Sequence, residues 1–241
     1  MMKKSLIRST VGIWGDSIMK GVVFDSALKK YTVVKESATF LFSRRFPITI
    51  RNHSRFGCTA PRAYEQLLRF LSTQDVPDDL VLLEFGGNDC DFRWREVSDD
   101  PLGKHQSNTP IDRFECTIRD MIHAVRRSGG HPVSMSLPPI HADRYFEYIT
   151  SDDRVDASRI MVFLGEKQTI YRRQEWYSSA LCRIARELNV PIVDVRSRFL
   201  EQVNLSDYLC MDGIHPNEKG QRLIHEVFSS AYYSFTGGQI S

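Results

Sequence analysis

Apolar and polar residues follow one another along the chain in blocks that are typical of alternating strands and helices. Five short runs have the composition of β-strands, and they cover residues 9–15, 46–53, 80–86, 131–137 and 190–195. The third of these, LVLLEFG, is almost continuously apolar, as expected for a strand that helices cover on both faces.

Helical spacing fills the segments between these runs. Apolar residues recur every three or four positions over 63–71, 114–125, 181–188 and 223–231. We also expect helices within 26–45 and over 156–177, the latter with Asp156 near its N-terminal end.

Alternating strands and helices predict a parallel sheet with helices on both faces. Right-handed crossovers favour a flavodoxin-like α/β fold, a three-layer α/β/α sandwich with a central five-stranded parallel sheet. We expect one such domain over residues 1–241.

Small and polar residues stand where the predicted strands end, and ligands of such sheets bind outside the carboxyl ends of the strands. Ser17 in GDS follows the first strand, Gly57 in NHSRFGCT the second and Asn88 in GGND the third. Asp212 and His215 in DGIHP follow the fifth. Each of these motifs is weak evidence for a site by itself, because a Ser after a strand is usually a helix cap and an Asn-Asp pair is usually a turn. Together they supply the parts of an acyl-transfer site.

This set of motifs, in this order, resembles the SGNH (GDSL-type) hydrolases. The resemblance covers nearly the whole chain, and DGIHP before a helix is its most specific part. It implies an oxyanion hole made by the backbone N–H groups of Ser17 and Gly57 and the side-chain amide of Asn88. Each such donor is typically worth about 10²–10³ in rate.

The side chains of Ser17, His215 and Asp212 also indicate how such a site would react. A Ser17 hydroxyl is too weakly acidic to attack an ester unaided and needs an adjacent base. His215 would take its proton and return it to the leaving alcohol. Asp212 would hold the other imidazole nitrogen, provided that residues 212–215 form a turn.

Other polar residues near these motifs have predicted structural roles or remain candidates for substrate contact. We expect Asp16 to fix its turn, Asp89 to bind loop backbone and Pro216 to open the last helix. His53 and His141 follow strands and are candidates for substrate contact.

Two segments, residues 90–110 and 138–176, exceed a minimal sandwich, and such long connections are uncommon unless they are functional or carry structure of their own. Both begin at carboxyl ends of strands, so we expect them to overhang the site. They could form sugar- or aryl-binding walls, a small subsidiary core or a dimer contact. Their aromatic residues are Phe92, Trp94, Tyr145, Phe146, Tyr148, Tyr171 and Trp176.

Charge, hydropathy and the absence of known motifs argue against several classes of binding partner. The net charge is +2 without a long basic run, which argues against a nucleic-acid partner. No apolar run reaches the roughly 18–20 residues of a membrane span, and the N-terminus lacks the apolar core of a signal peptide, so we expect a cytoplasmic protein without a membrane partner. The motifs of metal and nucleotide sites are absent, so no cofactor and no metal are implied.

The sequence therefore predicts a cofactor-independent serine esterase that forms an acyl-Ser17 intermediate on a small-molecule ester. A carbohydrate O-deacetylase acting on an acetylated sugar is favoured, because the long segments mix aromatic and polar residues. A lysophospholipase, a thioesterase or an acyltransferase on longer chains is the alternative among enzymes. A catalytically silent ligand-binding protein with the same fold is the alternative outside them. Acyl length, the alcohol moiety and the oligomeric state stay open.

Overall fold

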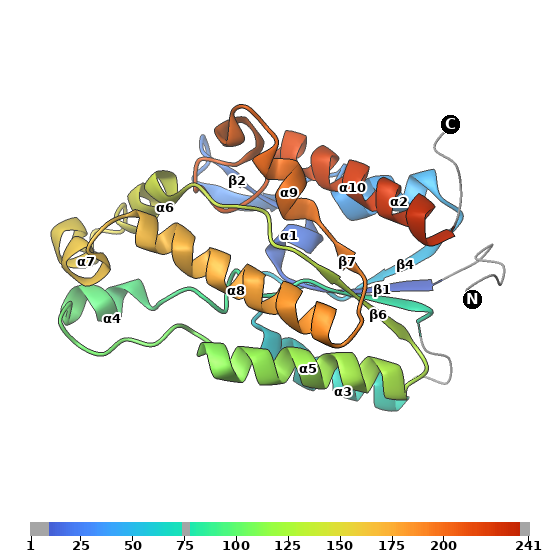
Figure 1. Ribbon diagram of the computed structural model, residues 1–241. Helices are drawn as coiled ribbons and strands as arrows, with labels where there is room; N and C mark the ends of the chain where they lie inside the picture. Colours follow the sequence, from blue (N-terminus) through green and yellow to red (C-terminus); the bar gives the residue numbers. More distant parts are fainter. Residues whose placement is uncertain (1–9, 74–77, 237–241) are drawn as a thin grey trace.

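The computed structural model describes residues 10–73 and 78–236. The first predicted strand residue, Ser9, and the segment examined for a signal peptide lie outside them. Five strands form one parallel sheet in the order β4-β1-β5-β6-β7, as in the predicted flavodoxin-like fold (Figure 1). Each falls within a predicted run: β1 (Thr10–Trp14), β4 (Thr49–Asn52), β5 (Leu80–Leu83), β6 (His131–Met135) and β7 (Ile192–Val193).

Successive side chains of β1 point to opposite faces of the sheet, as the period of a strand requires. Ile13 joins an apolar core on one face and Trp14 a second core on the other. Both side chains are almost fully buried, which explains why the central strands are apolar throughout.

Helices cover both faces and complete the three layers. The core that contains Trp14 lies under α3 (Ala60–Thr73), α5 (Ile111–Arg127) and α8 (Gln168–Glu187). The core that contains Ile13 lies under α2 (Ala38–Arg45), α9 (Val195–Leu200) and α10 (Glu218–Thr236).

The expectation of a helix within residues 26–45 is wrong for the first part of that range. β2 (Val22–Asp25) and β3 (Lys30–Val33) pair as an antiparallel hairpin, and only residues 38–45 are helical. The hairpin forms a sheet of its own beside the main one.

Local chemistry and long-range packing both favour the hairpin. The Asp25 carboxylate accepts two backbone N–H groups within the turn, and Lys29 adopts a positive φ of 47° there. The strands supply aromatic and β-branched residues, and the rings of Phe24 and Tyr31 pack 5.3 Å apart across them. A helix would separate these two rings.

The predicted helix over 156–177 is interrupted. α7 (Ala157–Leu164) ends at Gly165, whose φ is 73°, and α8 begins at Gln168. Asp156 caps α7 as predicted, since its carboxylate accepts the backbone N–H groups two and three residues ahead.

Pro216 does not open the last helix. α10 begins at Glu218, and the side chain of Asn217 accepts the backbone N–H of Gly220 in the manner of an N-cap. Pro216 instead forms an isolated bridge with Leu209, which fixes the loop before the helix.

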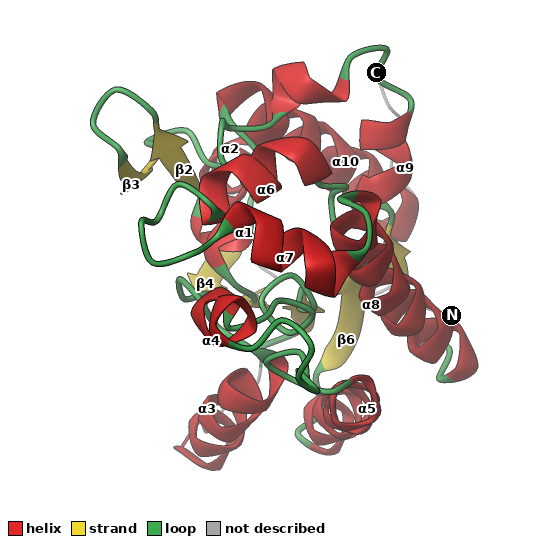
Figure 2. Cartoon of the chain, turned by 90° about the vertical axis from the view of Figure 1, so that its left-hand side faces the viewer, coloured by secondary structure: helices red, strands yellow, loops and turns green. Residues whose placement is uncertain are grey.

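The two long segments meet beyond the carboxyl ends of the strands. There α4 (Trp94–Asp99), α6 (Ala142–Ile149) and α7 lie together at the left-hand end of Figure 1 and face the viewer in Figure 2. They share a small apolar cluster that includes Phe92, Val97 and Ile160. This cluster is the subsidiary core that the sequence left open as one use of these segments.

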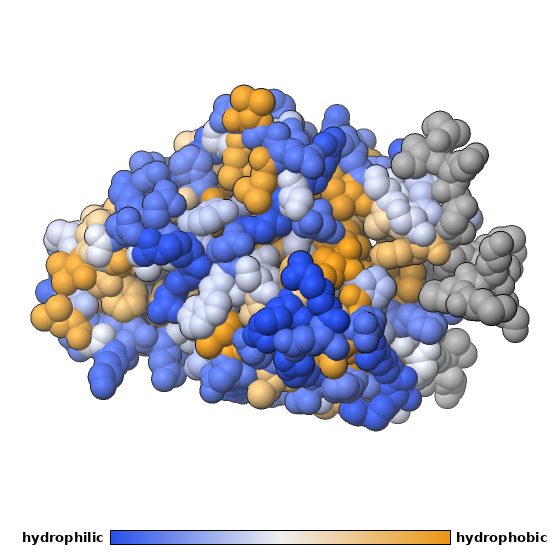
Figure 3. Space-filling view, viewed as in Figure 1, coloured by the Kyte–Doolittle hydropathy of each residue, from blue (hydrophilic) through white to orange (hydrophobic). Residues whose placement is uncertain are grey.

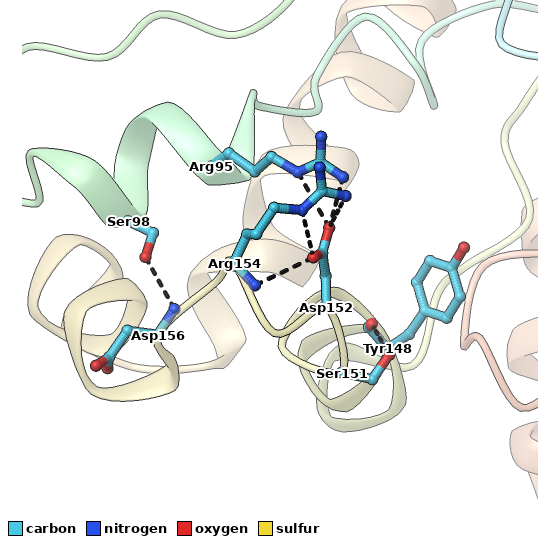
Figure 4. A network of polar contacts seen from close by, with 7 residues as sticks. All are labelled: Arg95, Ser98, Tyr148, Ser151, Asp152, Arg154 and Asp156. Atoms are coloured by element: carbon cyan, nitrogen blue, oxygen red, sulfur yellow. Dashed lines mark hydrogen bonds and ion pairs between the residues drawn. The ribbon is translucent and has the colours of Figure 1, made fainter.

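Polar contacts connect the same helices across their exposed side (Figure 4). The guanidinium groups of Arg95 and Arg154 both bind the carboxylate of Asp152, and the backbone N–H of Asp156 donates to Ser98 Oγ at 2.8 Å. Exposed ion pairs contribute little, typically 0–1 kcal/mol each. The apolar cluster therefore supplies most of the stability of this subsidiary unit.

The face of the molecule shown in Figure 3 is mostly hydrophilic, with separate groups of apolar residues at its left-hand end, at its top and near its centre. None of the helices within residues 10–73 and 78–236 combines the length and the apolar character that crossing a membrane requires.

Candidate active site

Ser17 is the first residue of a short helix, α1 (Ser17–Lys20), directly after β1. The Asp16 carboxylate caps this helix by accepting the backbone N–H of Ile18 at 2.9 Å. Asp16 therefore fixes the turn, as predicted. The Ser17 side chain is almost fully buried but borders a pocket at the sheet edge.

Ser17, His215 and Asp212 form one continuous chain of hydrogen bonds. Ser17 Oγ lies 2.8 Å from His215 Nε2, and His215 Nδ1 lies 2.6 Å from Asp212 Oδ2. An imidazole that donates through Nδ1 to a carboxylate has its Nε2 lone pair free to accept a hydroxyl proton. The structure thus brings together three residues from opposite ends of the chain in the geometry of a nucleophile, a base and an orienting acid.

The loop that carries Asp212 and His215 is a tight turn, as its predicted role requires. Asp212 Oδ1 accepts the backbone N–H groups of Ile214 and His215, both at 3.2 Å. Gly213 has a φ of 76°, and a Cβ there would lie 2.6 Å from the carbonyl oxygen of His141. Only glycine fits this position, and the backbone N–H of His141 binds the Gly213 carbonyl at 2.8 Å.

Gly57 and Asn88 line the same pocket as Ser17. The backbone N–H groups of Ser17 and Gly57 donate no hydrogen bond to any residue that the structure describes. A Cβ on Gly57 would meet open space, so its φ of 66° is what favours glycine there. Asn88 Nδ2 donates one hydrogen to Asp16 Oδ2 at 2.8 Å, which leaves its second hydrogen for a ligand.

The pocket has a volume of about 310 Å³ and extends from Ser17 under the two long segments. Four of the predicted aromatic residues line it: Phe92, Trp94, Tyr145 and Tyr148. Phe146, Tyr171 and Trp176 do not, and neither do His53 and His141. His53 instead stacks on Trp14, with ring centroids 4.5 Å apart.

Comparison with known families decides the identity. The model of the GDSL-like Lipase/Acylhydrolase family matches residues 13–223. The chain belongs to this family. It is therefore a carboxylic ester hydrolase of the SGNH/GDSL type, and the predicted resemblance is confirmed. No curated protein matches the sequence significantly.

Solved structures of an acylhydrolase, a hydrolase and an esterase share the fold. The lipase/acylhydrolase from Enterococcus faecalis has a TM-score of 0.66 and 15% identity, with 97% of this chain and 100% of that chain covered. An alpha/beta hydrolase enzyme from the metagenome of Lake Arreo, Spain, has a TM-score of 0.63 and 21% identity, with 97% of this chain and 97% of that chain covered. A catalytic mutant of an acetylxylan esterase from Geobacillus stearothermophilus has a TM-score of 0.60 and 17% identity, with 92% of this chain and 93% of that chain covered.

Three buried carboxyl groups, those of Asp16, Glu84 and Asp89, lie in and beneath the segments that carry Ser17 and Asn88. Asp16 and Glu84 are fully buried neighbours, and the backbone N–H of Asp16 donates to Glu84 Oε2 at 3.2 Å. Burial raises the pKa of both carboxyls, that of Glu84 most strongly because the charge of Asp16 adds to it. Asp89 accepts the backbone N–H of Ala60, as predicted for a loop brace, and burial raises the pKa of Asp89 to about 7.

Two aromatic residues beside His215 were not predicted. The Tyr31 ring lies 5.1 Å from the His215 ring, and the Phe56 ring lies 6.2 Å from it at an angle of 8°. Burial, with Tyr148 and Asp212 nearby, raises the pKa of Tyr31. Tyr31 was missed because it lay in a segment expected to be helical. Phe56 could have been found from its place beside Gly57.

Within the described ranges no cluster of three His, Cys, Asp or Glu side chains could hold a metal ion. The cysteines form no disulfides.

Proposed function

We propose that this protein is a serine esterase that works through an acyl-Ser17 intermediate. The observation that carries the proposal is the hydrogen-bond chain from Ser17 Oγ through His215 to Asp212, at 2.8 and 2.6 Å. As Oγ attacks the ester carbonyl carbon, His215 Nε2 takes its proton, and Asp212 stabilises the imidazolium that forms.

The attack places a negative charge on the former carbonyl oxygen. Three donors of this chain would bind it: the backbone N–H groups of Ser17 and Gly57 and the free amide hydrogen of Asn88. The imidazolium of His215 then gives its proton to the leaving alkoxide, and the C–O bond to the alcohol breaks. Water repeats the attack on the acyl-enzyme with His215 again as the base, which releases the acid and restores Ser17.

We infer a short acyl group, with an acetylated carbohydrate as the leading substrate. A pocket of about 310 Å³ is at the small end of ligand sites. Tyr31 and Phe56 offer aromatic surfaces beside His215, where the leaving alcohol must lie, and Tyr148 lines the same pocket. The fold shared with an acetylxylan esterase is consistent with this substrate class.

A longer acyl chain is the second candidate, and one feature favours it. Leu137, Leu164 and Ile170 line the part of the pocket that the second long segment covers. These apolar side chains could contact methylene groups of a longer acid.

Hydrolysis of p-nitrophenyl acetate, butyrate, octanoate and palmitate tests the proposal. Ser17→Ala should abolish turnover while its melting temperature stays near that of the wild type. Ser43→Ala, at a partly buried position outside the pocket, serves as the matched control. Activity that falls steeply beyond acetate supports a deacetylase, and activity that rises with length supports the second candidate. Turnover that survives in Ser17→Ala would refute the mechanism. A folded wild type without any activity would indicate a ligand-binding protein.

A further inference from the structure

Arg173 on α8 lines the same pocket as Ser17 and has no ionic partner. Its guanidinium lies 4.6 Å from the centre of the Phe92 ring. Among the residues that the structure describes, it makes no hydrogen bond and no ion pair. Its neighbour Arg172 pairs with Glu166, and Arg183 on the same helix pairs with Glu115 and Glu187.

An arginine in this position is prepared for an anion. The guanidinium always carries its charge and presents a planar fork of donors that fits a carboxylate with two parallel hydrogen bonds. Stacking on Phe92 restricts its motion, so less entropy is lost on binding. Arg173 is also partly buried, where an ionic contact is screened less than at the surface.

The carboxyl groups of the pocket are already engaged. Both oxygens of Asp91 accept hydrogen bonds, one from Trp94 Nε1 at 2.9 Å and one from Tyr145 Oη at 2.8 Å. Asp16 is bound by Ile18 and Asn88. Neither carboxyl forms an ion pair with Arg173, so its donors remain available to a ligand.

The place of Arg173 shows which part of an ester it would meet. Arg173 stacks on Phe92, which follows Asn88 by four residues in the first long segment, and both side chains line the pocket. The leaving alcohol must instead face His215, which Tyr31 and Phe56 flank. An acyl group that points away from His215 would extend toward Phe92, where Arg173 lies.

We propose that Arg173 binds a terminal carboxylate on the acyl group of the substrate, so that the enzyme prefers hemiesters of short dicarboxylic acids. Apolar residues such as Leu137 and Ile170 would contact the methylene groups between the ester and the carboxylate. This inference rests on the proposed serine-esterase function and narrows its short acyl group to one that ends in an anion.

The test compares charged and neutral esters of equal acyl length. kcat/KM is measured by ethanol release for the monoethyl esters of succinic, glutaric and adipic acid and for the ethyl esters of butyric, valeric and hexanoic acid. We expect the best hemiester to exceed its neutral counterpart by about 10–100-fold, the usual worth of a charged hydrogen bond. Arg173→Met should bring this ratio to about 1, and Arg173→Lys should leave part of it. Arg172→Met, which alters the paired neighbour, should keep the full ratio.

Each contrary result has a defined meaning. A wild-type ratio near 1, or an equal loss of the ratio in Arg172→Met, would overturn the inference. A preference for acetoxyacetate over ethyl acetate, measured by acetate release, without a preference for the hemiesters would place the anion on the alcohol, which also overturns the inference. Ser17-dependent cleavage without a charge preference removes this inference alone, whereas no Ser17-dependent cleavage of any ester removes the proposed function with it. If Arg173→Met fails to fold, the wild-type ratio and Arg173→Lys still decide.

Discussion

Asp16 accepts a hydrogen bond from the side-chain amide of Asn88 at 2.8 Å, which joins the turn before Ser17 to the loop after β5. The same carboxyl caps the helix that Ser17 begins, and the backbone N–H of Asp16 binds Glu84. One buried residue thus fixes the position of Ser17, the proposed nucleophile, and the orientation of the amide that would bind the oxyanion.

Asn88→Ala should lower kcat on p-nitrophenyl acetate by about 10²–10³ with a much smaller change in KM, because the amide would act on charge that exists only in the transition state. Steady-state kinetics measure both constants, and the exposed Asn204→Ala is the control. A loss confined to KM would instead make Asn88 a residue that binds the ground state.

Glu84→Gln should keep most of the activity and change the free energy of unfolding by no more than about 1 kcal/mol. The reason is that burial and the charge of Asp16 raise the pKa of Glu84 well above its usual range, which favours the neutral carboxyl, and an amide resembles a neutral carboxyl. Glu84→Ala should cost about 2 kcal/mol or more through the cavity that it leaves. Urea unfolding measures the stability of both variants and steady-state kinetics their kcat. Equal losses of stability and kcat in both variants would contradict a neutral Glu84.

Phe56→Ala should raise KM for aryl and sugar acetates by about 3–10-fold, since its ring lies beside His215 where the alcohol would stack. The ring is 52% exposed, so the melting temperature should change little. Phe40→Ala removes a ring that is 47% exposed on α2, outside the pocket, and should leave KM unchanged. An equal KM effect on ethyl acetate would exclude stacking as the cause.

Asp91→Asn should flatten the pH dependence of stability. Burial raises the pKa of Asp91 to about 6 from an ordinary 3.8, so folding favours the protonated form. Its contribution is complete below about pH 4 and is lost as the pH rises through 6. The free energy of unfolding of the wild type minus that of the variant should fall by up to about 3 kcal/mol between pH 4 and pH 7. Urea unfolding at both pH values measures it, and an unchanged difference would show that the pKa of Asp91 is not raised.

The sequence by itself predicted the sheet and the residues at its edge. Continuous apolar strands such as 80–86 and amphipathic helices between them leave few right-handed arrangements, because buried backbone must pair and apolar faces must be covered. Strand ends in a parallel sheet share one edge, so Ser17, Asn88 and His215 could be expected near one another without knowledge of any distance. Their roles stay predictions, while their proximity follows from topology.

Only the tertiary structure decided which side chains complete the pocket. Residues 22–33 form a hairpin because Tyr31 packs against rings that are distant in the sequence, Tyr148 and His215, and local periodicity carries no information about such contacts. Arg172 and Arg173 are adjacent in the sequence, yet about 100° of helical rotation separates them. The packing of α8 turns the first toward solvent and the second toward Phe92 and the pocket, and no property of the pair itself determines that choice.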